Sequence, residues 1–110
     1  MLFRSTTYTV RVIPSDTVYA VLDIRVGGYS SSGSGSASAY FAYGGHTGAY
    51  QLRTVFNDYT GNVTISTPSI VGGAIQFTIT ISAAGAGGVY LVMVSDLGAT
   101  PGKTASITVS

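Results

Sequence analysis

The chain has 110 residues, which suits one domain with a single core, so we treat residues 1–110 as one domain. Five basic and four acidic residues leave a net charge of +1, and the charged share of 8% is about a third of the usual value of roughly 25%. The basic residues are scattered along the chain, which excludes the clustered Lys and Arg that nucleic-acid binding requires.

Cysteine is absent, so no disulfide holds the fold together, and stability has to come from packing and backbone pairing. The first residues lack the apolar run of a signal peptide. No segment approaches the roughly 18 apolar residues that a membrane span requires, so we expect no membrane insertion.

Period-2 alternation of apolar side chains predicts about eight short β-strands and no helix. In chain order, we expect the strands over residues 6–13, 18–26, 37–43, 49–56, 62–66, 75–82, 89–94 and 104–109. The strand over 75–82 has the cleanest alternation, as expected of a half-buried antiparallel strand. The strand over 89–94 is apolar on both sides, so we expect it to be central or covered on both faces.

Three segments between these strands carry the composition of loops and turns. The Gly/Ser tract at 27–36 offers little apolar surface to bury, and we expect a mobile loop at a tip of the molecule. Residues 44–48 and 57–61 contain Gly, Asn and Asp, which tolerate turn conformations. The first of these turns would join the strands at 37–43 and 49–56 into a hairpin.

The fold class predicted from these elements is all-β, with a single antiparallel β-sandwich of about eight strands. The strand count favours a jelly-roll arrangement. An immunoglobulin-like sandwich is the alternative, although the Cys and Trp that mark immunoglobulin domains are missing.

The residues of known catalytic chemistry are nearly absent. His46 is the only His, and it lies between glycines in a predicted turn, where we expect an exposed polar residue. The chain has no G-x-S-x-G nucleophile motif, and one His without Cys is too few ligands for a zinc site. We expect the aspartates to be structural, and we expect no enzymatic activity, no metal site and no cofactor.

Tyrosines gather between positions 29 and 59, beside short polar side chains. Aromatic rings stack on the C–H faces of sugars while polar neighbours bind the hydroxyl groups, so this region is a candidate saccharide site. Alternatively, these tyrosines fill cross-strand positions or pack at contacts between subunits. The candidate ligand-binding residues are Tyr40, Tyr43, His46, Tyr50, Arg53, Asn57, Asp58 and Tyr59.

The charge-poor, Cys-free segments rich in Gly, Ser and Thr, the apolar strand at 89–94 and the C-terminal stretch Ser-Ile-Thr-Val-Ser resemble the distal or C-terminal β-domains of bacteriophage tail fibres and tailspikes. The resemblance covers the whole chain in style and implies an extracellular place in the virion tail. It also implies a homotrimer that caps the fibre, binds host-surface polysaccharide, or both. Three copies would bury one another's sheet faces, which accounts for the low surface charge.

Two other functions stay open from the sequence. A free-standing carbohydrate-binding module would use the tyrosines and Arg53 at an exposed site. A bacterial surface-adhesin domain would be a monomer joined to its neighbours by strand exchange or covalent cross-links. An isopeptide cross-link is not expected, since Lys103 is the only lysine.

Overall fold

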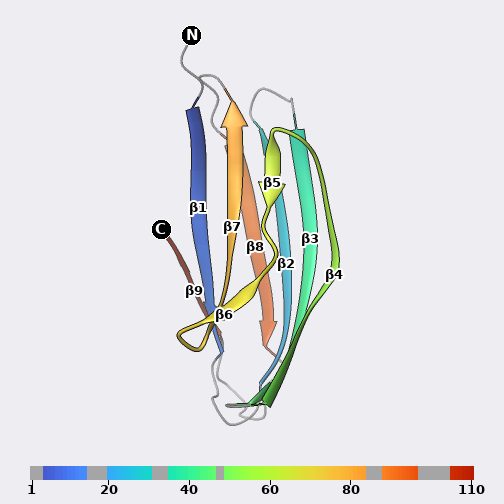
Figure 1. Cartoon of the computed structure of the whole chain (residues 1–110), viewed down its shortest axis with the longest axis vertical. Coiled ribbons are helices and arrows are strands. Elements are labelled where there is room, and N and C mark those ends of the chain that lie inside the picture. Colours follow the sequence, from blue (N-terminus) through green and yellow to red (C-terminus); the bar gives the residue numbers. More distant parts are fainter. Residues whose placement is uncertain (1–3, 15–19, 31–34, 47–48, 84–87, 97–104) are drawn as a thin grey trace.

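The computed structural model describes residues 4–14, 20–30, 35–46, 49–83, 88–96 and 105–110. These residues form two antiparallel sheets packed face to face, which confirms the predicted all-β sandwich (Figure 1). The strands are β1 (Arg4–Ile13), β2 (Ala20–Ser30), β3 (Gly35–His46), β4 (Ala49–Gly61), β5 (Val63–Ile65), β6 (Ser69–Val71), β7 (Ala74–Ala83), β8 (Gly88–Asp96) and β9 (Ser106–Val109). Of these, β6 was not predicted. Within the described ranges the chain forms no helix with the length and apolar character that a bilayer crossing requires.

The two sheets are built from different parts of the chain. Sheet A has the order β5-β7-β1-β9, and β6 also pairs with β7. Sheet B has the order β4-β3-β2-β8, in which β2, β3 and β4 form a meander. This order does not separate the jelly-roll from the immunoglobulin-like alternative.

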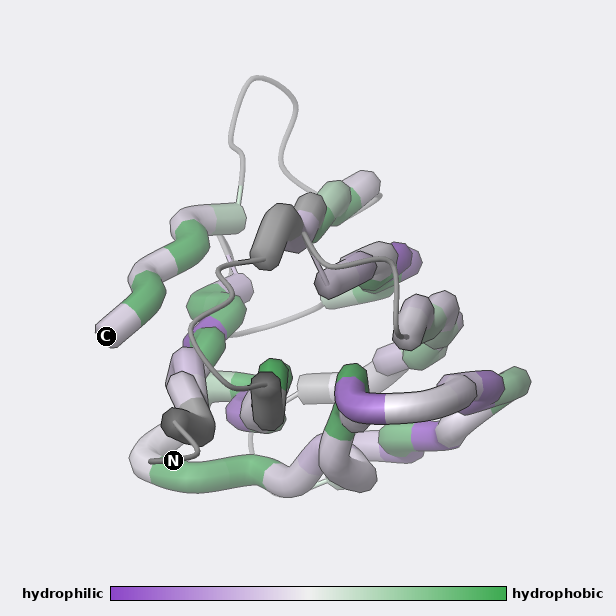
Figure 2. Tube along the Cα trace, turned by 90° about the horizontal axis from the view of Figure 1, so that it is seen from above, coloured by the Kyte–Doolittle hydropathy of each residue, from purple (hydrophilic) through white to green (hydrophobic). Residues whose placement is uncertain are grey.

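The core lies between the sheets and follows from the alternation of apolar residues along each strand (Figure 2). In the middle of the core, the buried rings of Phe41 on β3 and Phe77 on β7 meet edge to face, with centroids 5.1 Å apart. Tyr8 on β1 packs on Tyr90 on β8 at 4.7 Å between centroids. Aromatic contacts therefore join the sheets at two places.

A β-bulge interrupts the pairing of β3 with β4. Tyr40 lies opposite Phe56, but Phe41 lies opposite Thr54, so Val55 is the extra residue on β4. Because Val55 is an extra residue, the alternation of side chains between the two faces of β4 shifts by one position there. Residues before and after Val55 alternate regularly between the two faces only when Val55 is not counted.

All three predicted loops are wrong in part. In the Gly/Ser tract, residues 27–30 continue β2 and residues 35–36 begin β3; residues 27–29 pair with β3, and Ser30, which is fully buried, pairs with β8. Residues 44–46 continue β3 and residues 57–61 continue β4, and these two strands pair with each other. In each case the backbone ladder offered by the neighbouring strand outweighs the turn preference of Gly, Ser, Asn and Asp. The rest of the predicted loops, residues 31–34 and 47–48, lies outside the described residues.

The strand at 89–94 was predicted to be central or covered on both faces, but among the described residues β8 pairs only with β2 and ends sheet B. Tyr90, Val92 and Val94 are partly buried against the core. Met93 points the other way and is 60% exposed. The described residues of this chain therefore leave the outer face of β8 open at Met93.

Candidate functional site: a groove on the outer face of sheet B

The outer faces of the two sheets differ in chemistry. On sheet A, hydroxyl groups dominate, and the Thr7 and Thr80 side chains are joined by a 3.2 Å hydrogen bond. The outer face of sheet B instead carries charged and aromatic side chains from β2, β3 and β4. The outer face of sheet B therefore carries more of the groups that bind ligands.

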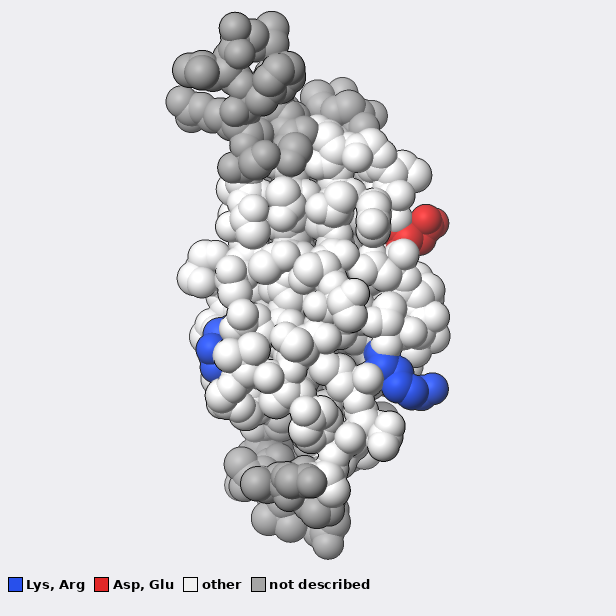
Figure 3. Space-filling model, in the orientation of Figure 1, with Lys and Arg blue, Asp and Glu red and all other residues white. Residues whose placement is uncertain are grey.

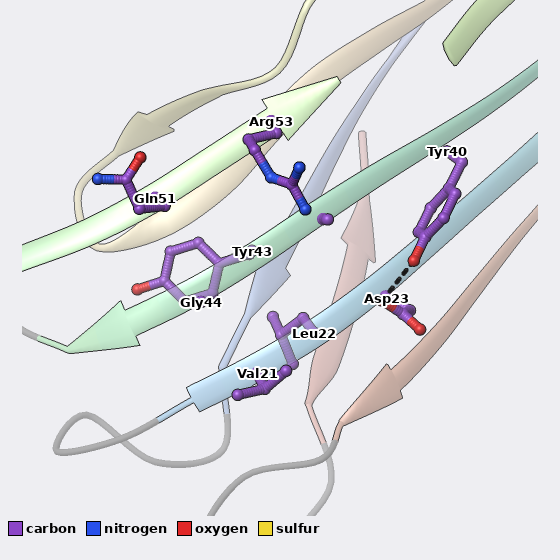
Figure 4. A pocket seen from close by; sticks show the side chains of 9 residues that line it. Val21, Leu22, Asp23, Tyr40, Tyr43, Gly44, Gln51 and Arg53 are labelled. Carbon is purple, nitrogen blue, oxygen red and sulfur yellow. Dashed lines mark hydrogen bonds between the residues drawn. The ribbon is translucent and has the colours of Figure 1, made fainter. Parts of the chain in front are cut away.

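A groove of about 360 Å³ lies on this face across three neighbouring strands (Figure 4). Its lining residues are Val21, Leu22 and Asp23 of β2, Tyr40, Ala42, Tyr43 and Gly44 of β3, and Gln51 and Arg53 of β4. Because β3 is hydrogen-bonded on both sides, to β2 and to β4, the backbone fixes the spacing of these residues.

Small residues of β3 make the floor of the groove. Ala42 lies between Asp23 and Arg53, its partners on the two flanking strands. Gly44 lies in the same way between Val21 and Gln51. A Cβ atom built on Gly44 would have no heavy atom within 4 Å, so the floor is open at this point. The larger side chains of β2 and β4 therefore form two walls with a depression between them.

One end of the groove is held by a set of polar contacts. The Tyr40 hydroxyl donates a 2.8 Å hydrogen bond to Oδ1 of Asp23. The Arg25 guanidinium lies over the Tyr40 ring, 4.1 Å from its centroid, a cation–π contact. The hydrogen bond to Asp23, with some desolvation, raises the pKa of Tyr40 above its ordinary value. Tyr40 is therefore neutral and a donor at physiological pH.

The two walls differ in charge. Asp23 stands on β2 and Arg53 on β4, with one strand between them, so their backbones are roughly 10 Å apart, twice the usual strand spacing. Asp23 supplies carboxylate acceptors, Arg53 supplies donors, and Gln51 supplies both. A polar molecule lying over the floor would meet hydrogen-bonding groups on opposite edges.

The predicted tyrosine cluster is split between the two faces of sheet B. Tyr40 and Arg53 stand on the outer face and line the groove. Tyr43 is also among the lining residues, but it lies three positions from Tyr40. It packs against buried residues of the core and stacks on Tyr50 with 6.1 Å between centroids. Burial raises the pKa of Tyr43, and Tyr50 adds to this shift. Tyr59, exposed near the far end of β4, lies on the same side as Tyr50.

The remaining predicted site residues have other positions. The Nδ2 of Asn57 donates a 2.8 Å hydrogen bond to the carbonyl of Ile65, which ties β4 to β5. Asp58 is exposed on the outer face beyond the groove. His46 ends β3, with its backbone opposite Ala49, and its side chain lies outside the described residues.

Sequence reasoning missed the acidic wall and the floor. The alternation over residues 18–26 puts Asp23 on the face opposite the apolar side chains, but nothing in it shows that this strand lies beside β3. Ala42, Gly44 and Gln51 carry no chemical signal of their own. For the tyrosines, the sequence does indicate the split. Tyr40 and Tyr43 are an odd number of residues apart in one strand, so their side chains are expected on opposite faces of the sheet.

Among the residues that the structure describes, no three of His, Cys, Asp and Glu lie close enough together to hold a metal ion. Comparison of the chain with protein-family models, with curated proteins and with solved structures found no match.

Proposed function

We propose that this chain is a non-enzymatic attachment module of a bacteriophage tail fibre or tailspike, which binds host-surface polysaccharide in the groove on sheet B. The observation that supports this most is an open groove with hydrogen-bonding side chains on both walls above a floor of small residues. The place in the virion, outside the cell, and the homotrimer are proposed from the resemblance in sequence.

The chemistry of the groove favours a saccharide over a peptide strand. An extended peptide binds a sheet by pairing with free backbone groups at an edge. Here the floor strand, β3, already pairs on both sides, so recognition has to come from side chains. Sugar hydroxyls both donate and accept, which suits the carboxylate of Asp23 on one wall and the guanidinium of Arg53 on the other.

The groove binds by hydrogen bonds more than by aromatic stacking. One face of the Tyr40 ring is covered by Arg25, so that face is closed to a sugar ring. The Tyr40 hydroxyl is directed at Asp23. Tyr40 is thus a positioning residue that holds the acidic wall, while Ala42 and Gly44 let the ligand approach the backbone.

Binding of the full chain to an array of bacterial surface polysaccharides tests the proposal. We expect the wild type to bind at least one glycan. Gly44→Val, which fills the floor, and Arg53→Ala, which removes donors, should each weaken this binding at least about tenfold, the loss of one charged hydrogen bond. The matched control is Tyr29→Ala, because Tyr29 is an exposed outer-face tyrosine of β2 outside the groove.

The outcomes separate the groove from the rest of the surface. No binding to any glycan, or loss of binding in Tyr29→Ala but not in the groove variants, would contradict the proposal. Circular dichroism and thermal unfolding of each variant establish that the variants are folded.

A free-standing carbohydrate-binding module and a bacterial surface-adhesin domain would use the same groove and differ in assembly. The open face of β8, with Met93 60% exposed, favours a module whose neighbouring copies cover that strand. The mass of the native particle distinguishes them: three chains support the homotrimer, and one chain supports either alternative.

A further inference from the structure

β4 is a long edge strand that is exposed on both faces. It spans 13 residues, and in the part of the chain that the structure describes β3 is the one strand that pairs with it through the backbone. Only Leu52 and Asn57 of β4 are partly buried, and the rest of the strand is exposed. The exposed fractions of its large apolar residues are 49% for Tyr50, 47% for Val55, 42% for Phe56 and 50% for Tyr59.

Natural edge strands are usually protected by Lys, Pro, short length or a β-bulge, because their free backbone groups pair with other chains. β4 is long and contains neither Lys nor Pro, so its bulge is the one of these devices that it has. Its two charged residues, Arg53 and Asp58, have opposite signs. Figure 3 shows acidic and basic atoms at the margin of the molecule where β4 lies in Figure 1, separated by uncharged surface. The edge is therefore open and balanced in charge.

The bulge at Val55 makes the sequence of β4 complementary to itself. Arg53 and Asp58 are five residues apart and would lie on opposite faces of a regular strand. Their partners on β3 show that they share the outer face with Phe56, since Val55 is the extra residue. Leaving Val55 out of the count, Arg53 lies two positions before Phe56, and Asp58 lies two positions after it.

We propose that β4 pairs antiparallel with β4 of a second copy of this chain, across a two-fold axis at Phe56. In this register Phe56 lies opposite Phe56 of the second copy, and Arg53 lies opposite Asp58 on the same outer face. By symmetry the charge pair forms twice. On the inner face, Leu52 lies opposite Tyr59.

The other registers that keep each side chain on its face lose this match. A shift by one outer-face pair in either direction brings Arg53 opposite Phe56 or opposite Thr60, neither of which is charged. Opposite charges directly across an antiparallel pair are favourable, and like charges are unfavourable. The charges of β4 therefore favour one register as well as the antiparallel orientation. Because the contact has a two-fold axis, it joins two copies and leaves no free β4 edge for a third.

Pairing through β4 joins the two sheets B into one sheet whose outer face carries both grooves. Asp58 of the second copy then stands beside Arg53 at the basic wall of each groove. Two grooves on one face also allow both to engage a repeating polymer, which raises avidity without a new contact. The contact lies at the edge of sheet B opposite β8, so it is separate from the proposed trimer contact.

The first experiment measures the mass of the native particle for the wild type and for charge variants. Arg53→Asp and Asp58→Arg each place like charges opposite one another and should halve the mass. The double variant with both substitutions should restore it. Thr64→Asp, at an exposed position on β5 of sheet A, is the control that leaves the β4 contact intact.

The second experiment uses the absence of cysteine from the chain. Residues directly opposite one another in an antiparallel pair have Cα atoms about 4.5 to 5.5 Å apart, within the range of a disulfide. Phe56→Cys should therefore form a covalent dimer under mild oxidation. Thr64→Cys, exposed on β5 of sheet A, should not.

The outcomes distinguish this inference from the proposed function. A mass of two chains supports β4 pairing and contradicts the homotrimer, whereas six chains support both. A mass of one or three chains overturns β4 pairing. Cross-linking of Phe56→Cys that is no faster than that of Thr64→Cys also overturns β4 pairing. This second test does not depend on whether the charge variants fold.

Discussion

The hydroxyl of Tyr40 and the carboxylate of Asp23 are joined by a 2.8 Å hydrogen bond that links β3 to β2 on the outer face of sheet B. The two residues are diagonal neighbours, because Tyr40 lies opposite Arg25 and Asp23 lies opposite Ala42. The bond holds the carboxylate at the wall of the groove, and Arg25 over the ring holds the tyrosine.

This bond predicts a pH dependence of stability. Since the hydrogen bond to Asp23 raises the pKa of Tyr40 above 10.0 in the folded chain, its stabilisation is fully present below pH 10.0. It is lost as the pH rises through the raised pKa, because the unfolded chain loses this proton first. Tyr40→Phe should lower stability at neutral pH, and its difference from the wild type should shrink above pH 10.0.

Urea unfolding at a series of pH values measures this difference, and Tyr29→Phe serves as the control on the same face. If the gap between the wild type and Tyr40→Phe stayed constant well above pH 10.0, the link between the hydrogen bond and the raised pKa would be wrong.

The contact between Phe41 and Phe77 predicts a large loss of stability on truncation. Both rings are buried, and each joins one sheet to the other. Phe41→Ala or Phe77→Ala should cost about 3 to 5 kcal/mol in the free energy of unfolding, because a cavity remains. Val71→Ala, at an exposed position, should stay within about 0.5 kcal/mol. Denaturant unfolding measures both, and equal losses at buried and exposed positions would count against this core.

Adjacent glycines of β3 predict opposite responses to alanine. Gly45 has a φ of 150°, and a Cβ there would run into the backbone of Ala49 and Tyr50. Gly45→Ala should therefore cost about 1 to 3 kcal/mol. Gly44→Ala has free space and should change stability by less than about 1 kcal/mol, since the outer face is open there. Thermal unfolding of the two variants compares them directly, and the reverse order of stability would show that this end of β3 is differently paired.

The hydrogen bond from Asn57 to Ile65 predicts that this residue acts in folding instead of ligand binding. Asn57→Ala leaves the Ile65 carbonyl without this donor and should cost about 1 to 3 kcal/mol. Glycan binding at a temperature where the variant is folded should equal that of the wild type. Binding lost without a change in stability would return Asn57 to the ligand site.

The strands that the alternation predicts most clearly are also those that make the core. The alternation over residues 75–82 puts Ile75, Phe77, Ile79 and Ile81 on one side of the strand, and all four are buried. The error at 57–61 arose because turn-forming residues were judged without their neighbour. A strand that pairs along its whole length tolerates Asn, Asp and Gly at its end.

The groove was predicted less well because it depends on strand order. Asp23 and Arg53 are far apart in sequence, and they lie on either side of Ala42 only because β2 and β4 both pair with β3. Alternation along one strand carries no information on its neighbours. The predicted tyrosine cluster was wrong for the opposite reason. Tyr40 and Tyr43 are close in sequence, but they lie on different faces of the sheet.

Among the residues that the structure describes, those that line the groove all belong to β2, β3 or β4. Val21 and Gly44 are paired near one end of β2, while Ser30 and Gly35 are at the other end of the same two strands. A peptide tag grafted between Ser30 and Gly35 should therefore leave ligand recognition intact. Such a site would let the chain carry a reporter or a second binding sequence without a change in the groove.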